Sequence, residues 1–350
     1  MVIYIGNKVS SHGYTPTAME DLVPKLSNNF LVKAISSKKN PIIRFFHMNY
    51  VYFVNISKLN LVIIDVFSSN AFFYALFFSV FSKIFCIPYL NVIRGGDMEK
   101  RINMSPGLTN YLFRNSEINI APSKFFFEML INKGFQSVCI PNFIDLHKYK
   151  YIIRQSIKPK LLWVRSFHEV YNPEMAIRVL DLLLKEYDNA ILTMVGPDKD
   201  GSKGKCLRLA NKFGINKNLQ IMGKLNKSQW HKLSENYDIF INTTHIDNTP
   251  ISVIEAMALG LPIVSTNVGG ISYLLKNKKN ALLVDDNDVI DMVNKIKFLI
   301  NNEKQSKLLS HNAYLTAKDF SWEKIGPQWE KIIRKYSKKN FKSTLHIKNL

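Results

Sequence analysis

The sequence predicts an α/β protein made of two domains, each with a doubly wound parallel sheet. Three observations lead to this prediction. The chain has 350 residues, which is long for a single hydrophobic core. Its hydrophobic content of 47% is typical of a globular protein. Short apolar runs rich in β-branched residues alternate with longer helical patterns, which indicates parallel strands covered by helices on both faces.

Five apolar runs predict the strands of the first sheet, at residues 2–5, 60–66, 88–93, 118–121 and 138–141. Between two of these runs lies "AFFYALFFSVFSKIFCI", residues 71–87, which is apolar enough to consider as a membrane segment. It has only 17 residues and contains Lys83, so it is at the lower limit for a spanning helix. We therefore interpret it as an apolar helix of a layered domain, and a helix that faces a membrane is the alternative.

The second half begins after a polar, basic stretch at residues 145–160, which predicts a linker. The strands of the second sheet are expected at residues 161–164, 190–196, 219–223, 238–242, 262–265 and 281–284. A last helix is expected around 322–336, and Pro327 should bend or break it. The predicted domains are therefore 1–150 and 151–325, followed by a terminal helix and basic tail at 326–350. The ligand of such sheets lies in the cleft facing the carboxyl ends of the strands.

The formal net charge of +20 implies attraction to polyanions, such as anionic lipid, nucleic acid or phosphorylated substrates. Residues 331–350 hold seven Lys or Arg and no acid. This tail predicts docking on an anionic membrane surface or a solubilising role. The sequence shows no zinc spacing, no RNP-like aromatic motif and no helix-turn-helix signal, so no nucleic-acid partner is expected.

The three cysteines, Cys86, Cys139 and Cys206, are odd in number and lack the spacing of metal sites or redox pairs. They predict reduced thiols in a cytoplasmic protein. No signal peptide is visible at the N-terminus, because the first apolar run ends after four residues. Together with the charge, this predicts a cytoplasmic location, with docking on the inner face of a membrane as a further possibility.

The stretch "DNTPISVIEAMALGLPIVSTNVGG", residues 247–270, predicts a loop, a helix and the next strand. Thr249 is expected as the N-cap and Pro250 in the first helical turn. The helix N-terminus then points into the cleft, where the amide groups of residues 250–253 can bind a phosphate and Ser252 adds a hydroxyl. Asn248 and Ile251 complete this predicted donor-binding segment.

Glu255 lies in the middle of this apolar helix, and Asp247 precedes it by eight positions. Burying a bare carboxylate costs several kcal/mol, so the site must provide hydrogen-bond donors. The hydroxyls of a bound ribose would do so. A structural glutamate that is paired with backbone amides or a neighbouring lysine explains the pattern equally well.

This stretch resembles the donor-site signature of the retaining glycosyltransferases of family 4, also described as glycosyl transferases group 1. "VIEAMALGLPIVSTNVGG" matches the second half of the signature closely, whereas the first acid is Asp247 instead of the usual Glu. The resemblance continues in "APS" (121–123), "IPNFID" (140–145), "LLWVRSF" (161–167) and "VGPDKDG" (195–201). These motifs occur in the order and at the spacing of the family.

The resemblance implies a GT-B fold, in which two Rossmann-like domains face a central cleft and a C-terminal helix crosses back to the first domain. It implies transfer of a hexose-type sugar, with retention at the anomeric carbon, from a UDP-, GDP- or ADP-sugar. The expected acceptor is a saccharide or lipid-linked saccharide in surface polysaccharide or glycolipid synthesis. It further implies that no metal ion or other cofactor is needed.

The resemblance also implies roles for single residues. Arg165 matches the arginine that binds the donor diphosphate, and its guanidinium suits a phosphate. The family shows Lys and Gly where this chain has Tyr171 and Asn172, so one cation is missing. Either Tyr171 donates a neutral hydrogen bond or another cation compensates. Gly196 ends the strand beneath the nucleotide base.

The two acids receive roles from the same resemblance. Asp247 would face the transferred sugar, and Glu255 would bind the ribose. A front-face mechanism, in which the leaving phosphate takes the proton of the acceptor, fits the lack of an obvious catalytic carboxylate pair. A covalent adduct on Asp247 is the alternative mechanism.

In the first domain, "VIRGGDM" (92–98) stands where the family usually shows a His before a Gly-rich turn. Arg94 replaces that His, and we expect it to restore the charge that is missing at Tyr171. An ion pair with Asp97 or Glu99 is the other interpretation. Gly95, Gly96 and Asp97 are expected on the acceptor side. Gly13, in the first strand–helix loop, is expected to approach the donor closely.

Two other functions are compatible with parts of this pattern. A sugar-nucleotide epimerase or hydrolase has the same fold but needs further acid and base residues, and the sequence does not identify a set. A basic nucleic-acid-binding protein would explain the net charge alone. The lack of a G-x-G-x-x-G fingerprint in the first loop argues against a dinucleotide dehydrogenase.

Overall fold

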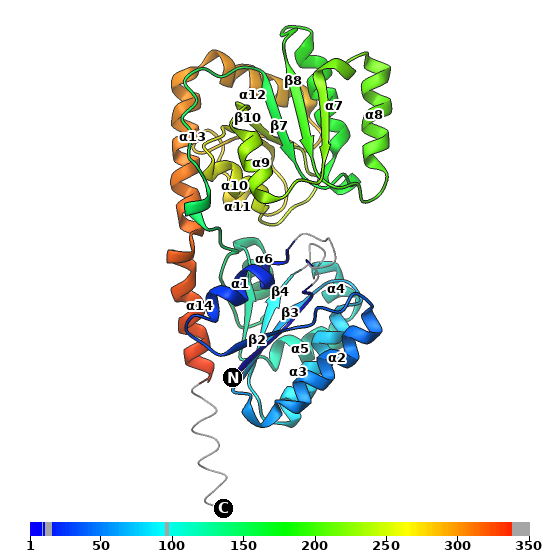
Figure 1. Cartoon of the computed structure of the whole chain (residues 1–350), viewed down its shortest axis with the longest axis vertical. Coiled ribbons are helices and arrows are strands. Elements are labelled where there is room, and N and C mark those ends of the chain that lie inside the picture. Colours follow the sequence, from blue (N-terminus) through cyan, green and yellow to red (C-terminus); the bar gives the residue numbers. More distant parts are fainter. Residues whose placement is uncertain (9, 11–15, 95–97, 338–350) are drawn as a thin grey trace, which may run out of the picture. The chain divides into compact units, whose positions relative to one another are not determined.

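The structure is a computed structural model that describes residues 1–8, 10, 16–94 and 98–337. The chain divides into two compact units (Figure 1). The first comprises residues 1–142 together with the segment that starts at Glu323, and the second comprises Phe143–Trp322. Each unit contains one six-stranded parallel sheet flanked by helices, so the predicted α/β fold class is confirmed.

The sheet of the first unit has the strand order β2-β1-β3-β4-β5-β6, and neighbouring strands pair in parallel. The sequence predicted every strand of it except β2. Its strands are β1 (Val2–Ile5), β2 (Val32–Ile35), β3 (Leu61–Val66), β4 (Tyr89–Ile93), β5 (Ile118–Ala121) and β6 (Ser137–Cys139).

The helices of the first unit cover this sheet, and α2, α3 and α5 contribute to one hydrophobic core. The apolar segment 71–87 forms α3, which buries Phe72, Ala75 and Phe78 in that core. It is therefore a helix of a layered domain, as predicted. The helices are α1 (Ala18–Leu26), α2 (Pro41–Val54), α3 (Phe72–Ile84), α4 (Met98–Met104), α5 (Pro106–Arg114) and α6 (Lys124–Asn132).

The sheet of the second unit has the order β12-β11-β10-β7-β8-β9, again in parallel. Its strands are β7 (Lys160–Val164), β8 (Ile191–Val195), β9 (Leu219–Gly223), β10 (Ile239–Asn242), β11 (Ile263–Thr266) and β12 (Leu282–Val284). Its helices are α7 (Pro173–Leu184), α8 (Ser202–Phe213), α9 (Lys227–Ser234), α10 (Ile251–Ala258), α11 (Ile271–Leu274), α12 (Val289–Asn301) and α13 (Glu303–Ala317).

Residues 145–160, which the sequence predicted as a linker, lie within the second unit. Arg154 in this segment is buried, and its guanidinium donates to the carbonyl oxygens of Ser234, Leu259 and Gly260 at 2.9 to 3.1 Å. These carbonyls lie at the C-terminal ends of α9 and α10, where a positive charge is favourable. Arg154 therefore ties the segment to the helix that carries Glu255.

A bend or a break was expected at Pro327, and the last helix, α14 (Trp322–Ser337), does not break there. Pro327 lies in the second turn of this helix, so it removes the backbone hydrogen bond to the carbonyl oxygen of Glu323, and the helix continues on either side of it. The helix is attached to the first unit: Glu330 accepts a hydrogen bond from Asn29 at 2.7 Å, and Arg334 lies over the Phe30 ring. Among the described residues, no helix combines the length and the apolar character that a bilayer span requires.

Candidate functional site

The candidate site lies at the carboxyl edge of the second sheet, where the loops after neighbouring strands converge. Arg165 directly follows β7, and Asp247 lies in the loop between β10 and α10. The turn Gly269–Gly270 follows β11. Because β7, β10 and β11 are neighbours in a parallel sheet, their carboxyl ends present these loops at one place.

Arg165 and Asp247 form a direct ion pair between the guanidinium and the carboxylate. The two side chains are only 15% and 14% exposed. The guanidinium also lies over the ring of Tyr171, 4.6 Å from its centroid, which is a cation–π geometry. Burial lowers the pKa of Arg165, and the nearby Tyr171 opposes this shift. Its Nε has no hydrogen-bond partner among the described residues. The site thus contains a buried guanidinium whose Nε–H group is available to donate a hydrogen bond to a ligand.

The loop that carries Asp247 is held by the Gly269–Gly270 turn. The amide of Gly270 donates to the carbonyl oxygen of Asp247 at 2.8 Å. A Cβ atom on Gly270 would overlap the carbonyl oxygen of Asn248 and reach its Cα at 2.9 Å. The carboxylate of Asp247 also accepts from the amide of Asn248 at 2.8 Å. Close approach of two backbones therefore places the Asp247 carboxylate, which explains the paired glycines.

Helix α10 points its N-terminus at the same edge. It begins at Ile251 with Pro250 as N-cap, one residue later than expected from Thr249. No side chain of the described residues caps this end. The hydroxyl of Ser252 is buried and has no hydrogen-bond partner within that part of the chain. The positive end of the helix dipole and an unused hydroxyl therefore lie where the sequence predicted a phosphate site.

Asn172 stands where the resemblance led us to expect glycine, and its backbone explains why asparagine is accepted. Its φ angle is +44°, in the left-handed region, which asparagine tolerates better than most residues. Its side chain accepts from the amide of Met175 at 3.2 Å and so caps α7. It also donates to Asn287 at 3.2 Å. Asn172 therefore keeps the turn that a glycine would make.

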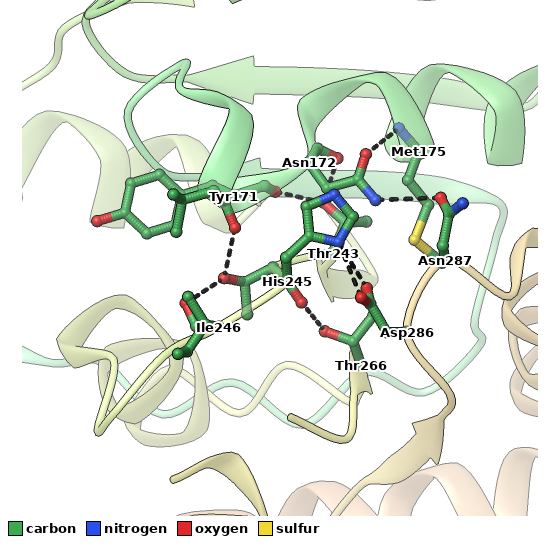
Figure 2. A network of polar contacts seen from close by, with 11 residues as sticks. Tyr171, Asn172, Met175, Thr243, His245, Ile246, Thr266, Asp286 and Asn287 are labelled. Carbon is green, nitrogen blue, oxygen red and sulfur yellow. Dashed lines mark hydrogen bonds and ion pairs between the residues drawn. The ribbon is translucent and has the colours of Figure 1, made fainter. Parts of the chain in front are cut away.

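A polar network fixes the loop after β10 (Figure 2). The hydroxyl of Thr243 donates to the carbonyl oxygens of Tyr171 and Asn172 at 3.0 and 2.8 Å. His245 contacts both carboxylate oxygens of Asp286, at 2.8 and 2.9 Å. The loops after β7, β10 and β12 are thus joined. The sequence analysis did not select Thr243, His245 or Asp286, because no motif distinguishes them from ordinary polar loop residues.

Glu255 is buried, with 3% of its surface exposed, and the protein itself supplies its partners. The hydroxyl of Tyr149 donates to its Oε1 at 2.8 Å, and Lys227 lies 3.5 Å from the same oxygen. His231 lies 3.9 Å from Oε2. The sequence interpretation of a glutamate held by a neighbouring lysine describes this geometry, although Tyr149 and His231 were not foreseen. A bound ribose is not needed to explain the burial.

Replacing Tyr149 with Phe is expected to lower the free energy of unfolding by about 2 kcal/mol, because a buried carboxylate loses a hydrogen bond. Urea denaturation measures this loss. Tyr50→Phe is the matched control, since its side chain is 68% exposed. Equal stabilities for the two variants would show that the Tyr149 hydroxyl does not support Glu255.

Gly196 lies against the backbone of Arg165. A Cβ atom at this position would overlap the Arg165 carbonyl oxygen and approach its carbonyl carbon at 2.6 Å. The Gly196 amide donates to the carbonyl oxygen of Gly223 at 2.7 Å. The ends of β7, β8 and β9 therefore approach closely here. This close contact explains why position 196 is a glycine, without reference to a nucleotide base.

Arg94 lies in the first unit, at the end of β4, and forms a buried network. It donates to Asp65 at 2.9 Å, to Asn142 at 2.7 Å and to the hydroxyl of Tyr4 at 3.2 Å. Burial raises the pKa of Asp65, and the Arg94 charge opposes this shift. An ion pair with an acid was one of the two sequence interpretations, but the acid is Asp65, 29 positions away, and not a neighbour in the sequence.

Four predicted residues cannot be placed. Gly13, Gly95, Gly96 and Asp97 lie outside the described residues. Within the described part of the chain, no group of three or more His, Cys, Asp or Glu side chains is arranged to hold a metal ion.

The part of the chain that contains the candidate site also matches known proteins. Residues 152–316 match the family model of "Glycosyl transferases group 1". An uncharacterized glycosyltransferase of Haemophilus influenzae is 30% identical over 158 residues, which cover 45% of this chain and 44% of the relative. UDP-Gal:alpha-D-GlcNAc-diphosphoundecaprenol alpha-1,3-galactosyltransferase of Escherichia coli is 24% identical over 190 residues, or 49% and 47% of the two chains. The chain thus spans less than half the length of these relatives.

The fold is similar over almost the whole chain to a solved GT-B structure, sucrose-phosphate synthase from Thermosynechococcus elongatus. The TM-score is 0.79, with 95% of this chain and 98% of that chain covered, at 15% sequence identity. At this low sequence identity, the similarity shows the fold alone. We conclude that residues 152–316 form a glycosyl transferases group 1 domain within a chain of GT-B fold.

Proposed function

We propose that this protein is a retaining glycosyltransferase of the family 4 type, which moves a hexose from a nucleoside-diphosphate sugar to a saccharide or lipid-linked saccharide. One observation carries the proposal. In a group 1 domain, the Arg165–Asp247 pair and the N-terminus of α10 lie at one edge of the sheet. A guanidinium and the free amides of a helix N-terminus together suit a diphosphate.

The diphosphate is proposed to bind between Arg165 and the first turn of α10, at Ile251 and Ser252. Negative charge builds up on the phosphate oxygens as the bond to the sugar breaks, and donors already in position stabilise it. The spare Nε of Arg165 and the hydroxyl of Ser252 are such donors among the described residues. Since these groups supply the charge and hydrogen bonds, we propose a reaction that needs no metal ion or other cofactor.

Asp247 is proposed to face the transferred sugar. In the front-face reaction, the bond from the anomeric carbon to the phosphate oxygen breaks, and a bond to the acceptor hydroxyl forms on the same face. The leaving phosphate takes the proton of that hydroxyl. Asp247 is paired with Arg165, which holds the carboxylate in place. A glycosyl adduct trapped on Asp247 would instead establish double displacement.

Glu255 is proposed to accept hydrogen bonds from the ribose hydroxyls, in addition to its contacts with Tyr149 and Lys227. A carboxylate has about four acceptor positions, so protein partners do not exhaust it. Tyr171 is proposed to act on the donor through Arg165, because its ring lies against that guanidinium. Asn248 and Thr249 are proposed to border the sugar, and Gly196 the base.

The first unit is proposed to bind the acceptor. The Escherichia coli relative is named for a diphosphoundecaprenol-linked acceptor, which motivates a lipid-linked saccharide here. The charge of Arg94 is balanced by Asp65, so compensation for the cation missing at Tyr171 requires this pair to open. Near-normal donor affinity and turnover of Arg94→His and Arg94→Ala would contradict that compensation.

Nucleoside diphosphates are expected to stabilise the protein. At a hundred times its dissociation constant, the correct one of UDP, GDP and ADP should add about 2.7 kcal/mol to the free energy of unfolding. Thermal shift with the three nucleotides measures this effect, and the corresponding nucleosides serve as controls. The absence of a shift with any diphosphate would contradict the proposed donor site.

The reaction itself is tested by product analysis with a panel of nucleotide-sugars that carry the base chosen by thermal shift. Transfer to a saccharide or lipid-linked acceptor, with an unchanged anomeric configuration, is the expected result. An epimerised donor, or a donor hydrolysed at the same rate with and without acceptors, would replace glycosyl transfer by the epimerase or hydrolase reaction.

A further inference from the structure

The outer side of α2 carries a row of exposed apolar side chains, which we call the α2 face. On a helix of 3.6 residues per turn these side chains fall within an arc of about 120°. The buried residues Met48, Val51 and Tyr52 lie on the opposite side and enter the core. The exposed fractions range from 56% to 68%, and the residues of the α2 face are Ile42, Ile43, Phe46, Tyr50 and Val54.

The α2 face lies on an aromatic layer between α2 and α3, which lie side by side (Figure 1). Phe45 packs edge-on against Phe77 with ring centroids 4.9 Å apart, and Phe53 packs against Phe81 at 5.2 Å. The aromatic layer continues to Phe85 at the end of α3. Phe85 is 45% exposed, and its ring centroid lies 6.1 Å from that of Phe53. An apolar surface therefore remains on the first unit that its described residues leave exposed.

The surroundings of this face are positively charged. From residue 22 to residue 94 the sequence contains eight Lys or Arg and a single acid, Asp65. That acid is buried and paired with Arg94, so it does not offset the surface charge. Lys38 and Lys39 are exposed just before α2, and Lys58 is exposed just after it. Basic residues therefore flank the apolar row at both ends.

We propose that the α2 face docks on an anionic phospholipid surface, with its apolar row in the headgroup boundary and the flanking lysines on lipid phosphates. Apolar side chains on one arc of a helix, bordered by lysines and without acids, are what an interfacial helix requires. A second copy of the same face would bring like charges together, so the charge favours a lipid partner. This surface is separate from the proposed donor site, which lies in the second unit.

The test uses the full chain and vesicles of phosphatidylglycerol and phosphatidylethanolamine at low salt, with pure phosphatidylcholine vesicles for comparison. The unchanged chain should sediment with the anionic vesicles. Ile42→Ser/Phe46→Ser/Tyr50→Ser should lower the partition coefficient at least tenfold. The matched control, Ile290→Ser/Leu308→Ser/Leu315→Ser, removes three exposed apolar side chains from the second unit and should bind normally.

Lys38→Gln/Lys39→Gln/Lys58→Gln should also weaken binding several-fold, because charge attraction to anionic lipid is lost. The basic tail is kept in all variants, so it cannot account for differences between them. Loss of sedimentation for the triple serine variant counts only if its circular dichroism and its thermal shift with a nucleoside diphosphate match those of the unchanged chain.

A conservative substitution to tryptophan reports membrane contact by fluorescence and is not expected to destabilise the fold. Phe46→Trp should show blue-shifted emission and quenching by brominated lipids with anionic vesicles, whereas Ile290→Trp should not. Three results would overturn the proposal: no sedimentation of the unchanged chain, equal binding of the triple serine variant, or a dimer in sedimentation velocity that this variant dissociates.

Discussion

Replacing Arg165 with Ala is expected to lower kcat/KM for the nucleotide-sugar donor by about a thousandfold, because a buried donor to the leaving diphosphate is lost. The guanidinium has its Nε unused among the described residues and is held by Asp247 and the Tyr171 ring. It is therefore in place before the donor binds. Initial rates over a range of donor concentrations measure the effect.

Arg165→Lys should recover only part of the loss, since a lysine keeps the charge but not the planar fork of donors. Arg178→Ala is the control, because Arg178 is half exposed and pairs with Glu174 of its own helix at 3.9 Å. If Arg165→Ala and Arg178→Ala have the same kcat/KM, Arg165 does not bind the diphosphate.

Replacing Gly270 with Ala is expected to lower kcat by about a hundredfold, because a displacement of about 1 Å at a reacting group has an effect of this size. The added Cβ would overlap the Asn248 carbonyl oxygen, so the loop that carries Asp247 must move. The backbone of Gly270 is in the right-handed region, with φ at −77°, so alanine is not strained there. Single-turnover rates at saturating donor separate this effect from weaker binding.

Gly107→Ala is the matched control for Gly270→Ala. Gly107 lies in α5, and a Cβ there would meet no atom within 4 Å. The control should keep full activity and gain a little stability, as a helical Gly-to-Ala change usually does. If Gly270→Ala also keeps full activity, the proposed link between the glycine turn and Asp247 is wrong.

The fold class could be predicted from the sequence because most strands are continuous apolar runs. Strand β2 was missed because it is different: Val32–Ile35 is four residues long, contains Lys33 and lies at the edge of its sheet with only one residue buried. An edge strand of this kind has no strong apolar signal. A break was one of the two outcomes expected at Pro327, and it does not occur, because α14 continues on both sides of the proline.

The candidate site was predictable where a short motif contains it. Arg165, Asp247 and the start of α10 each belong to one strand–loop unit, so their convergence follows from the parallel sheet. The partners of Glu255 come from distant segments: Tyr149 lies 106 positions away. Asp65, the partner of Arg94, is likewise set by strand order and not by local spacing. Such contacts depend on tertiary packing, which a single sequence does not display.

The most direct test of the account is a crystal structure of the protein with the nucleoside diphosphate that gives the largest thermal shift. We predict phosphate oxygens within hydrogen-bond distance of the Arg165 guanidinium and of the backbone amides or the Ser252 hydroxyl at the start of α10. A diphosphate that is bound elsewhere, with the Arg165–Asp247 pair untouched, would contradict the proposed donor site.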